Sequence, residues 1–169
     1  MISKSCEEGL WKNYDEKNVL HVASEKGNLR LVKSLIDCGF DKETKSTYGN
    51  TPLICASQHG HFEVVQYLFS VGADKEVKNK EGVTSLIWAS QNGYLEVVKY
   101  LVSIGAKKDA KDNNGNTPLI KASSNDRLEV VKYLVSIGAK RDAKYKDGRS
   151  PLSVATGNVR PHLKSLGFQ

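Results

Sequence analysis

The residues that could perform chemistry are two close histidines, a set of aspartates in turns, and three cysteines. His59 and His61 flank Gly60 and form the one close histidine pair of the sequence. A zinc site normally needs three or four ligands, and no cysteine pair has metal-binding spacing, so we expect no metal site. The aspartates lie in turn segments, where Asp commonly bonds its own backbone, so we expect neither calcium binding nor catalysis from them. They are Asp109, Asp112, Asp142 and Asp147.

Enzyme motifs are missing from the sequence. No Gly-rich phosphate loop, nucleophile elbow or His-Glu-x-x-His segment occurs. Cys6, Cys38 and Cys55 are odd in number and widely spaced, which is typical of reduced thiols rather than of a disulfide framework. We therefore expect a protein that is not an enzyme, has no catalytic residues, and uses no cofactor and no small-molecule substrate.

The charge of the chain is a second candidate for function. Residues 1–78 contain 10 Lys and Arg against 11 Asp and Glu, and residues 79–169 contain 15 against 8, so the second half carries +7 and the first half −1. A basic strip can attract phosphates, which makes nucleic-acid binding the alternative function. The aspartates between the basic residues, and the lack of aromatic residues spaced to stack bases, favour a solvated edge. If the strip does bind a partner, an acidic protein is favoured over nucleic acid. The strip comprises Lys107, Lys108, Lys111, Lys140, Arg141, Lys144, Lys146 and Arg149.

The sequence shows no signal for membrane insertion or secretion. Its longest apolar stretches, such as 97–104, are far shorter than the roughly 20 residues that span a bilayer. Glu7 and Glu8 stand where a signal peptide needs an apolar core, and no Asn-x-Ser/Thr acceptor occurs. We expect a cytoplasmic protein.

An internal repeat of 33 residues organises the chain. The segment 49–54 (GNTPLI) recurs in related form at 82–87, 115–120 and 148–153, and the segment 63–68 (EVVQYL) recurs at 96–101 and 129–134. These spacings predict an N-terminal capping segment at 1–12, full repeats at 13–45, 46–78, 79–111 and 112–144, and a shortened C-terminal capping repeat at 145–169.

Each repeat predicts two helices followed by an extended turn. A capping residue precedes the first helix, where its side-chain oxygen can accept from first-turn amides. A glycine ends that helix because it adopts the left-handed conformation cheaply. Asp126 replaces this glycine in the fourth repeat, and Asp tolerates the left-handed conformation better than most residues. If Asp126 is left-handed, Asp126→Gly is expected to stabilise the protein by about 0.5–1 kcal/mol. The second helix carries an apolar face that must be buried on the first helix and on the next repeat. The capping residues are Asn18, Thr51, Thr84, Thr117 and Ser150, and the glycines are Gly27, Gly60 and Gly93.

These segments resemble the ankyrin repeat family, whose signature is Thr-Pro-Leu-His-x-Ala, a glycine, an apolar second helix and Gly-Ala-Asp. The resemblance covers residues 13–169, with Ile54, Ile87 and Ile120 where most members have His, as in near-identical arrays of some unicellular eukaryotes. It implies an all-α solenoid of stacked helix-turn-helix units with extended turn or hairpin connections. It also implies a monomeric, non-enzymatic scaffold that binds another protein through its concave face, made of turn tips and the outer stripe of the first helices.

The residues of that face can be placed by helical geometry. Leu86 and Ala89 must face the core, so Trp88, about 200° round the helix from Leu86, faces away from it. The alternative is that the Trp88 indole folds down against the adjacent repeat as packing. The predicted partner-binding residues are Tyr48, Cys55, Gln58, His59, Lys80, Glu81, Trp88, Gln91, Asn92, Asn113, Asn114, Lys121, Ser124, Asn125, Lys146 and Arg149.

Overall fold

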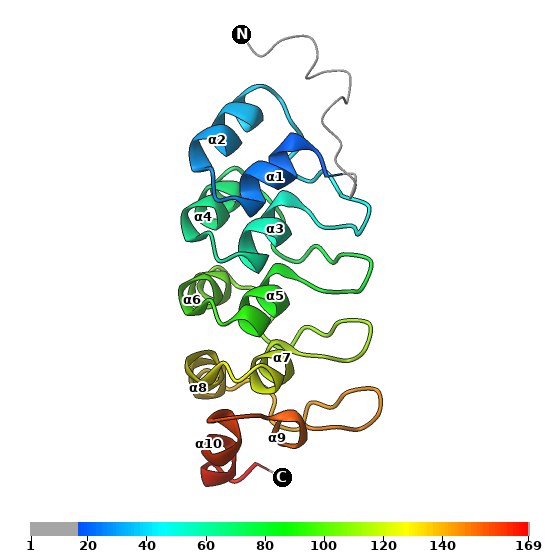
Figure 1. Cartoon of the computed structure of the whole chain (residues 1–169), viewed down its shortest axis with the longest axis vertical. Coiled ribbons are helices and arrows are strands. Elements are labelled where there is room, and N and C mark those ends of the chain that lie inside the picture. The colour runs from blue at the N-terminus through cyan, green and yellow to red at the C-terminus, as the bar shows by residue number, and fades with distance from the viewer. Residues whose placement is uncertain (1–16, 169) are drawn as a thin grey trace.

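The computed structural model describes residues 17–168, and within that range it contains ten helices and no strand. The helices form five pairs that stack along the long axis of the molecule (Figure 1). The predicted all-α solenoid is therefore confirmed, whereas the predicted capping segment 1–12 lies outside the described residues. The pairs are α1 Val19–Glu25 with α2 Leu29–Asp37, α3 Pro52–Gln58 with α4 Phe62–Ser70, α5 Ser85–Asn92 with α6 Leu95–Ser103, α7 Pro118–Ser124 with α8 Leu128–Ser136, and α9 Pro151–Val154 with α10 Val159–Ser165.

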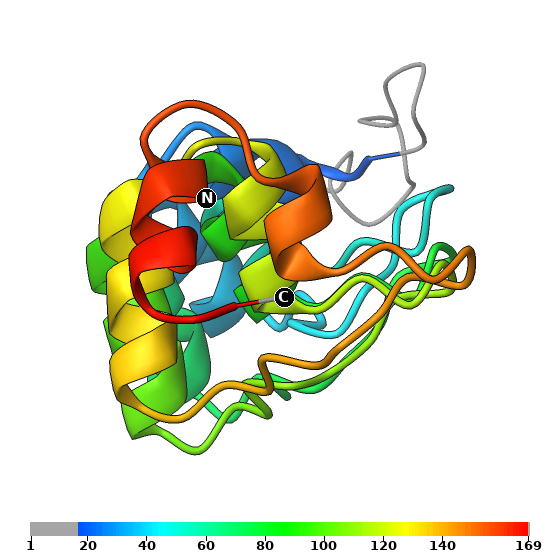
Figure 2. The ribbon, with the colours of Figure 1, turned by 90° about the horizontal axis from the view of Figure 1, so that it is seen from below.

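The stack has three parallel parts. The second helices of the pairs form one side, the first helices form the middle, and the connections between pairs project on the other side (Figures 1 and 2). We call these projections the fingers, which comprise residues 41–50, 74–83, 107–116 and 140–149. The core lies between the two helix layers, where apolar side chains recur at the repeat period. Leu53, Leu86 and Leu119 are buried there, and burying one leucine contributes about 2 kcal/mol.

The first helices begin at the predicted capping residues. The Thr51 hydroxyl accepts a hydrogen bond from the Ile54 backbone N–H at 3.4 Å, and Thr84 accepts from Ile87 in the same way at 3.3 Å. Thr117, Ser150 and Asn18 cap the other first helices. The predicted caps are thus confirmed, and they explain why every first helix starts at the same place in its repeat.

Backbone hydrogen bonds join each finger to the next one at its tip. The Lys80 N–H donates to the Tyr48 carbonyl at 3.0 Å, and the Asn113 N–H donates to the Glu81 carbonyl at 2.9 Å. The third bond of this series runs from the Lys146 N–H to the Asn114 carbonyl at 3.0 Å. The finger tips therefore form a continuous ladder rather than independent loops.

Carboxylates join the fingers at their base. Glu43 accepts from the Asp74 N–H at 2.8 Å, Glu76 accepts from the Lys107 N–H at 3.0 Å, and Asp109 accepts from the Lys140 N–H at 2.8 Å. We call these three acceptors the base carboxylates. Hydrogen bonds to a charged acceptor are the stronger kind, so each of the last three fingers is held at two points by the finger before it.

Two basic side chains of the strip stabilise helix ends. The Lys108 ammonium donates to the Ile137 carbonyl at 2.8 Å, at the end of α8. Arg141 donates to the Leu166 carbonyl at 3.1 Å, at the end of α10, and its guanidinium lies 5.0 Å from the ring centre of Phe168. Cations are favourable at a helix C-terminus. Lys108 and Arg141 therefore have a structural role that the charge count did not predict.

The last helix pair is anchored by Asp126. Asp126 has a φ of 53°, which confirms the predicted left-handed conformation at the end of the first helix of the fourth repeat. Its carboxylate also accepts from the Val159 N–H at 3.0 Å, at the start of α10. The α10 helix has no cap from Asn158, so Asp126 supplies that cap from another repeat.

This contact reverses the expected effect of Asp126→Gly. The substitution raises the free energy of unfolding by up to about 1 kcal/mol, because glycine adopts the left-handed backbone without strain. It also removes a charged helix cap, which lowers the free energy of unfolding by about 1–2 kcal/mol. We expect Asp126→Gly to lower the free energy of unfolding by about 1 kcal/mol, as measured by urea denaturation. Asp126→Asn keeps an acceptor oxygen at the same position and is the control, with an expected loss under about 0.5 kcal/mol. A higher denaturation midpoint for Asp126→Gly would show that the cap contributes less than the backbone strain.

Candidate protein-interaction surface

The first helices and the finger tips together form the surface on which the predicted residues lie, and we call it the groove surface. Two hollows lie along it. The first has a volume of about 250 Å³ and combines residues of the first and second fingers with α3 and α5. It is lined by Lys17, Tyr48, Asn50, Gln58, Asn79, Glu81 and Trp88. Four of its residues, Tyr48, Gln58, Glu81 and Trp88, were predicted from the sequence.

The second hollow lies farther along the groove surface. It has a volume of about 350 Å³ and joins the third and fourth fingers to α7. Its lining is Asn114, Asn116, Lys121, Tyr145, Lys146, Asp147 and Arg149. Asn114, Lys121, Lys146 and Arg149 were predicted for this surface. Each hollow thus collects side chains from different repeats, which a single repeat could not do.

Trp88 is held in place by the helices around it. The residue is half-buried, and its indole N–H is fully buried without an acceptor among the described residues. Each sequence interpretation of Trp88, as an exposed anchor or as packing, therefore describes part of the ring. One part packs against the protein, and another part lines the first hollow. A rigid aromatic surface of this kind is a common anchor in protein interfaces.

The prediction that Cys55 is exposed to a partner is wrong, although Cys55 lies on the same helix stripe as Trp88. Cys55 is only 1% exposed, and burial raises the pKa of its thiol to about 12. Its helix, α3, packs between α1 and α5, and the thiol is too short to emerge between them. Trp88 and Lys121, at the equivalent position of later repeats, are long enough to reach the surface.

Several predicted polar residues hydrogen-bond across the repeat junctions. The Asn92 amide donates to the Gln58 carbonyl at 2.7 Å, and the Asn113 amide donates to the Lys80 carbonyl at 2.9 Å. The Gln91 carbonyl accepts from Arg127 at 3.1 Å. These bonds reduce the polar groups left for a partner. The remaining predicted residues of the groove surface are half-buried or exposed, namely His59, Ser124 and Asn125.

The histidines bond to backbone carbonyls. His61 donates to the Glu25 carbonyl at 2.7 Å, and the His59 ring lies 3.0 Å from the Cys55 carbonyl. His21, which the sequence reasoning did not single out, is buried and bonds through Nε2 to the Asn50 carbonyl at 2.9 Å. Burial lowers the pKa of His21, so the neutral ring joins α1 to the first finger. All three rings therefore contribute to the structure of the repeats rather than to a metal site.

The second hollow contains two residues that the prediction missed, Asp147 and Tyr145. Both contact the predicted Arg149, which pairs with Asp147 at 2.8 Å and whose guanidinium lies 4.6 Å from the ring centre of Tyr145. Burial raises the pKa of Tyr145, whose ring is half-buried. Tyr145 occupies the position of its finger that Asp112 occupies in the preceding finger. Aligning the fingers position by position would have shown this change from a carboxylate to an aromatic ring.

The family model of ankyrin repeats, described as three copies, matches the chain in overlapping windows. The windows are residues 3–79, 20–112, 69–147 and 86–166. A potassium channel of rice (Oryza sativa subsp. japonica), KOR2, is 38% identical over 52 residues, which are 31% of this chain and 6% of the channel. The matched segment is thus a small part of that relative. Among residues 17–168, no helix is both long enough and apolar enough to cross a bilayer.

Proposed function

This chain belongs to the ankyrin repeat family, and from that premise we propose that it is a non-enzymatic scaffold that binds a partner protein through the groove surface. Ankyrin repeats are generally protein–protein interaction modules. The proposed binding units are the repeats bounded as predicted, and the proposed site is the concave face with the two hollows. The scaffold would act as a cytoplasmic monomer. The unpaired thiols Cys38 and Cys55 agree with a reducing compartment.

The main support for this proposal is that the rigid fingers and the two hollows lie on the same surface. The hydrogen-bond ladder fixes the finger tips before a partner arrives, which lowers the ordering cost of binding. The first hollow supplies an aromatic anchor, and the second supplies Lys121, Lys146 and Arg149. Because Asp147 neutralises Arg149, the two lysines carry the excess charge of the second hollow. We propose an acidic protein segment as the partner on this ground.

Affinity capture from the source cell tests the proposal. The triple variant Gln58→Ala, Trp88→Ala and Lys121→Ala removes side chains from both hollows, and it should lose the partner that the unchanged protein retains. The matched control changes Gln66, Lys99 and Lys132, which are exposed on the second helices, to alanine. Partner retention by the groove variant, or loss by the control variant, would contradict the proposed surface, provided that circular dichroism shows both variants folded.

Salt dependence separates this function from the alternative of nucleic-acid binding. Affinity for a multi-phosphate contact falls by about 10³ or more between 50 and 200 mM salt, whereas we expect binding of the captured protein to fall much less. Lys108 and Arg141 stabilise helix ends, which weakens the case for a phosphate-binding strip. Tight DNA or RNA binding at physiological salt, abolished by Lys107→Glu with Lys140→Glu, would favour the alternative.

A further inference from the structure

The fourth finger has a base carboxylate without a hydrogen-bond partner. Glu43, Glu76 and Asp109 each accept a backbone N–H located 31 residues farther along the chain. Asp142 stands 33 residues after Asp109, at the same position of its finger. Within residues 17–168 its carboxylate forms neither a hydrogen bond nor an ion pair. The carboxylates at the three equivalent positions each bind polypeptide backbone. The Asp142 carboxylate is therefore an unused acceptor of the same kind.

The tip of the same finger has a second acceptor in register. The carbonyls of Tyr48, Glu81 and Asn114 each accept a backbone N–H from the following finger. The equivalent carbonyl is that of Asp147, which accepts no hydrogen bond from the described part of the chain. In the three complete junctions the two donors are six residues apart, as Asp74 and Lys80 are. The fourth finger thus repeats both halves of a backbone-binding arrangement.

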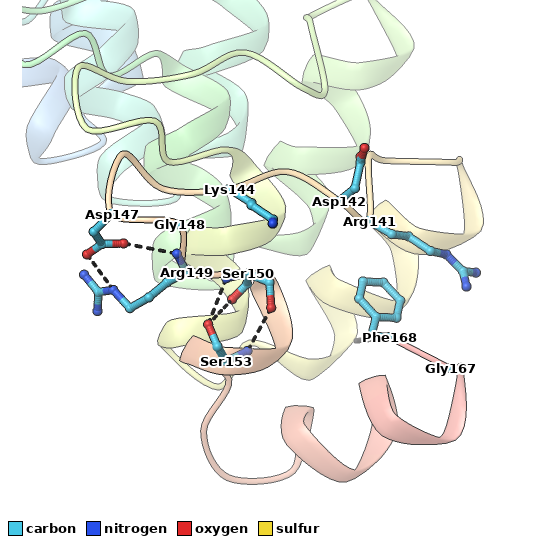
Figure 3. A pocket seen from close by; sticks show the side chains of 10 residues that line it. All are labelled: Arg141, Asp142, Lys144, Asp147, Gly148, Arg149, Ser150, Ser153, Gly167 and Phe168. Carbon is cyan, nitrogen blue, oxygen red and sulfur yellow. Dashed lines mark hydrogen bonds and ion pairs between the residues drawn. The ribbon is translucent and has the colours of Figure 1, made fainter.

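Asp142 and Asp147 both line one cleft. The cleft has a volume of about 750 Å³ and lies between the fourth finger, the start of α9 and the segment that follows α10 (Figure 3). Figure 3 shows Asp142 on one arm of the finger with its exposed carboxylate directed away from Phe168, Asp147 at the tip of the finger, and Phe168 facing the finger from the C-terminal segment. Lys144 also lines the cleft, is exposed, and has no ion pair within residues 17–168.

The helix layer beside this cleft does not offer a stacking surface. Ile120 and Val131 are fully buried in the fourth repeat. Ser153 is the counterpart of Ile120 in the last repeat. When the buried Val159 and Leu163 of α10 are aligned with the buried residues of α8, Arg160 is the counterpart of Val131. Both Ser153 and Arg160 are exposed. A helix pair packed below α9 and α10 would meet a hydroxyl and a guanidinium rather than apolar side chains. The cleft therefore suits an extended segment without helices of its own.

We propose that this end cleft is a second binding site, which adjoins the second hollow and shares Asp147 and Arg149 with it, for an extended acidic peptide segment of a partner protein. One backbone N–H of the peptide donates to the Asp142 carboxylate, and another donates to the Asp147 carbonyl, as in the interior junctions. A carboxylate of the peptide pairs with Lys144. The charge of the lining favours an acidic ligand, because Arg149 is paired with Asp147 and the remaining cations, Arg141 and Lys144, outnumber Asp142.

A peptide that copies an interior finger tests this site. The probe is an acetylated peptide with the sequence of residues 74–84, in which its three lysines are replaced by glutamate. A matched peptide carries N-methyl groups at the positions of Asp74 and Lys80, which removes the two N–H donors. In NMR titrations of the full chain, the probe should shift amide signals of residues 141–153, and N-methylation should weaken binding at least about fivefold, the effect of one lost hydrogen bond.

Protein variants give the second arm of the test. Asp142→Ala and Lys144→Glu should each weaken binding of the acidic probe at least about fivefold. Asp37→Ala and Lys45→Glu are the controls, since both residues are exposed at the other end of the stack, and Trp88→Ala removes the groove anchor; none of the three should alter probe binding. The proposal is overturned by absent binding up to about 1 mM peptide, by equal binding of the N-methylated peptide, or by shifts confined to the residues of the first hollow.

Discussion

Truncation of Trp88 to alanine is expected to cost at least about 2 kcal/mol of partner affinity, which is roughly a 30-fold rise in Kd. The indole lines the first hollow and is kept in one orientation by packing on its buried edge. A rigid aromatic group loses little conformational entropy on binding, and interface energy concentrates in such groups. Titration of the captured partner measures this loss directly.

The same substitution also affects folding, because the ring is half-buried. We expect Trp88→Ala to lower the free energy of unfolding by about 1–2 kcal/mol, less than the roughly 3–5 kcal/mol typical of a fully buried tryptophan. Tyr100→Ala is the control with the opposite balance. Tyr100 lies on the other helix layer in edge contacts with Phe62 and Phe69, at ring-centre distances of 5.7 and 6.2 Å. Its truncation should destabilise the protein by about 2 kcal/mol or more and leave affinity unchanged.

The result that would contradict the anchor role is unchanged partner affinity in Trp88→Ala. In that case the partner binds to the finger tips or to another face. Trp88→Lys gives an independent check, since Lys121 occupies the equivalent position of the fourth repeat and is tolerated there. This variant should retain stability better than Trp88→Ala while still losing the aromatic contact.

Replacement of Gly82 by alanine should destabilise the protein by about 3 kcal/mol, of which the backbone conformation accounts for about 1–2 kcal/mol. Gly82 has a φ of 77°, in the left-handed region that an alanine adopts only with strain. An added Cβ would also lie 2.8 Å from the backbone nitrogen of Asn113 in the next finger, so the two fingers must separate. That shift strains the hydrogen bond from the Asn113 N–H to the Glu81 carbonyl.

Gly148 provides a matched control for Gly82. It occupies the same turn position in the fourth finger and has a φ of 86°, but an added Cβ would meet no atom within 4 Å. Gly148→Ala should therefore cost only the backbone contribution, about 1–2 kcal/mol. Chemical denaturation of both variants isolates the contribution of the finger contact. Equal losses would show that the contact between the second and third fingers tolerates displacement.

Much of the fold could be predicted because each local signal repeats in register. The positions of Thr51 and Thr84 correctly indicated where their helices begin. Asp126 was correctly expected to adopt a left-handed conformation. These features depend on a few neighbouring residues. The use of the Asp126 carboxylate depends instead on how the shortened last repeat lies against the fourth, which no local pattern contains.

The candidate surface could be predicted less completely. Helical geometry places Trp88 and Cys55 on the same stripe, but burial depends on side-chain length and on the separation of neighbouring helices. The same limit applies to Lys108, whose ammonium caps a helix of the next repeat. Charge counts describe the total of a surface and do not distinguish free cations from those already bound to carbonyls.

The finger ladder also determines how a disturbance travels through the protein. Its hydrogen bonds connect only adjacent fingers, so loosening of one finger reaches a distant finger solely through those between them. Such an array behaves as a one-dimensional series of coupled units, in which influence weakens with each step. A ligand in the end cleft would therefore affect the conformation of the second hollow strongly and that of the first hollow weakly. Two partners could occupy the far ends of this stack almost independently of each other.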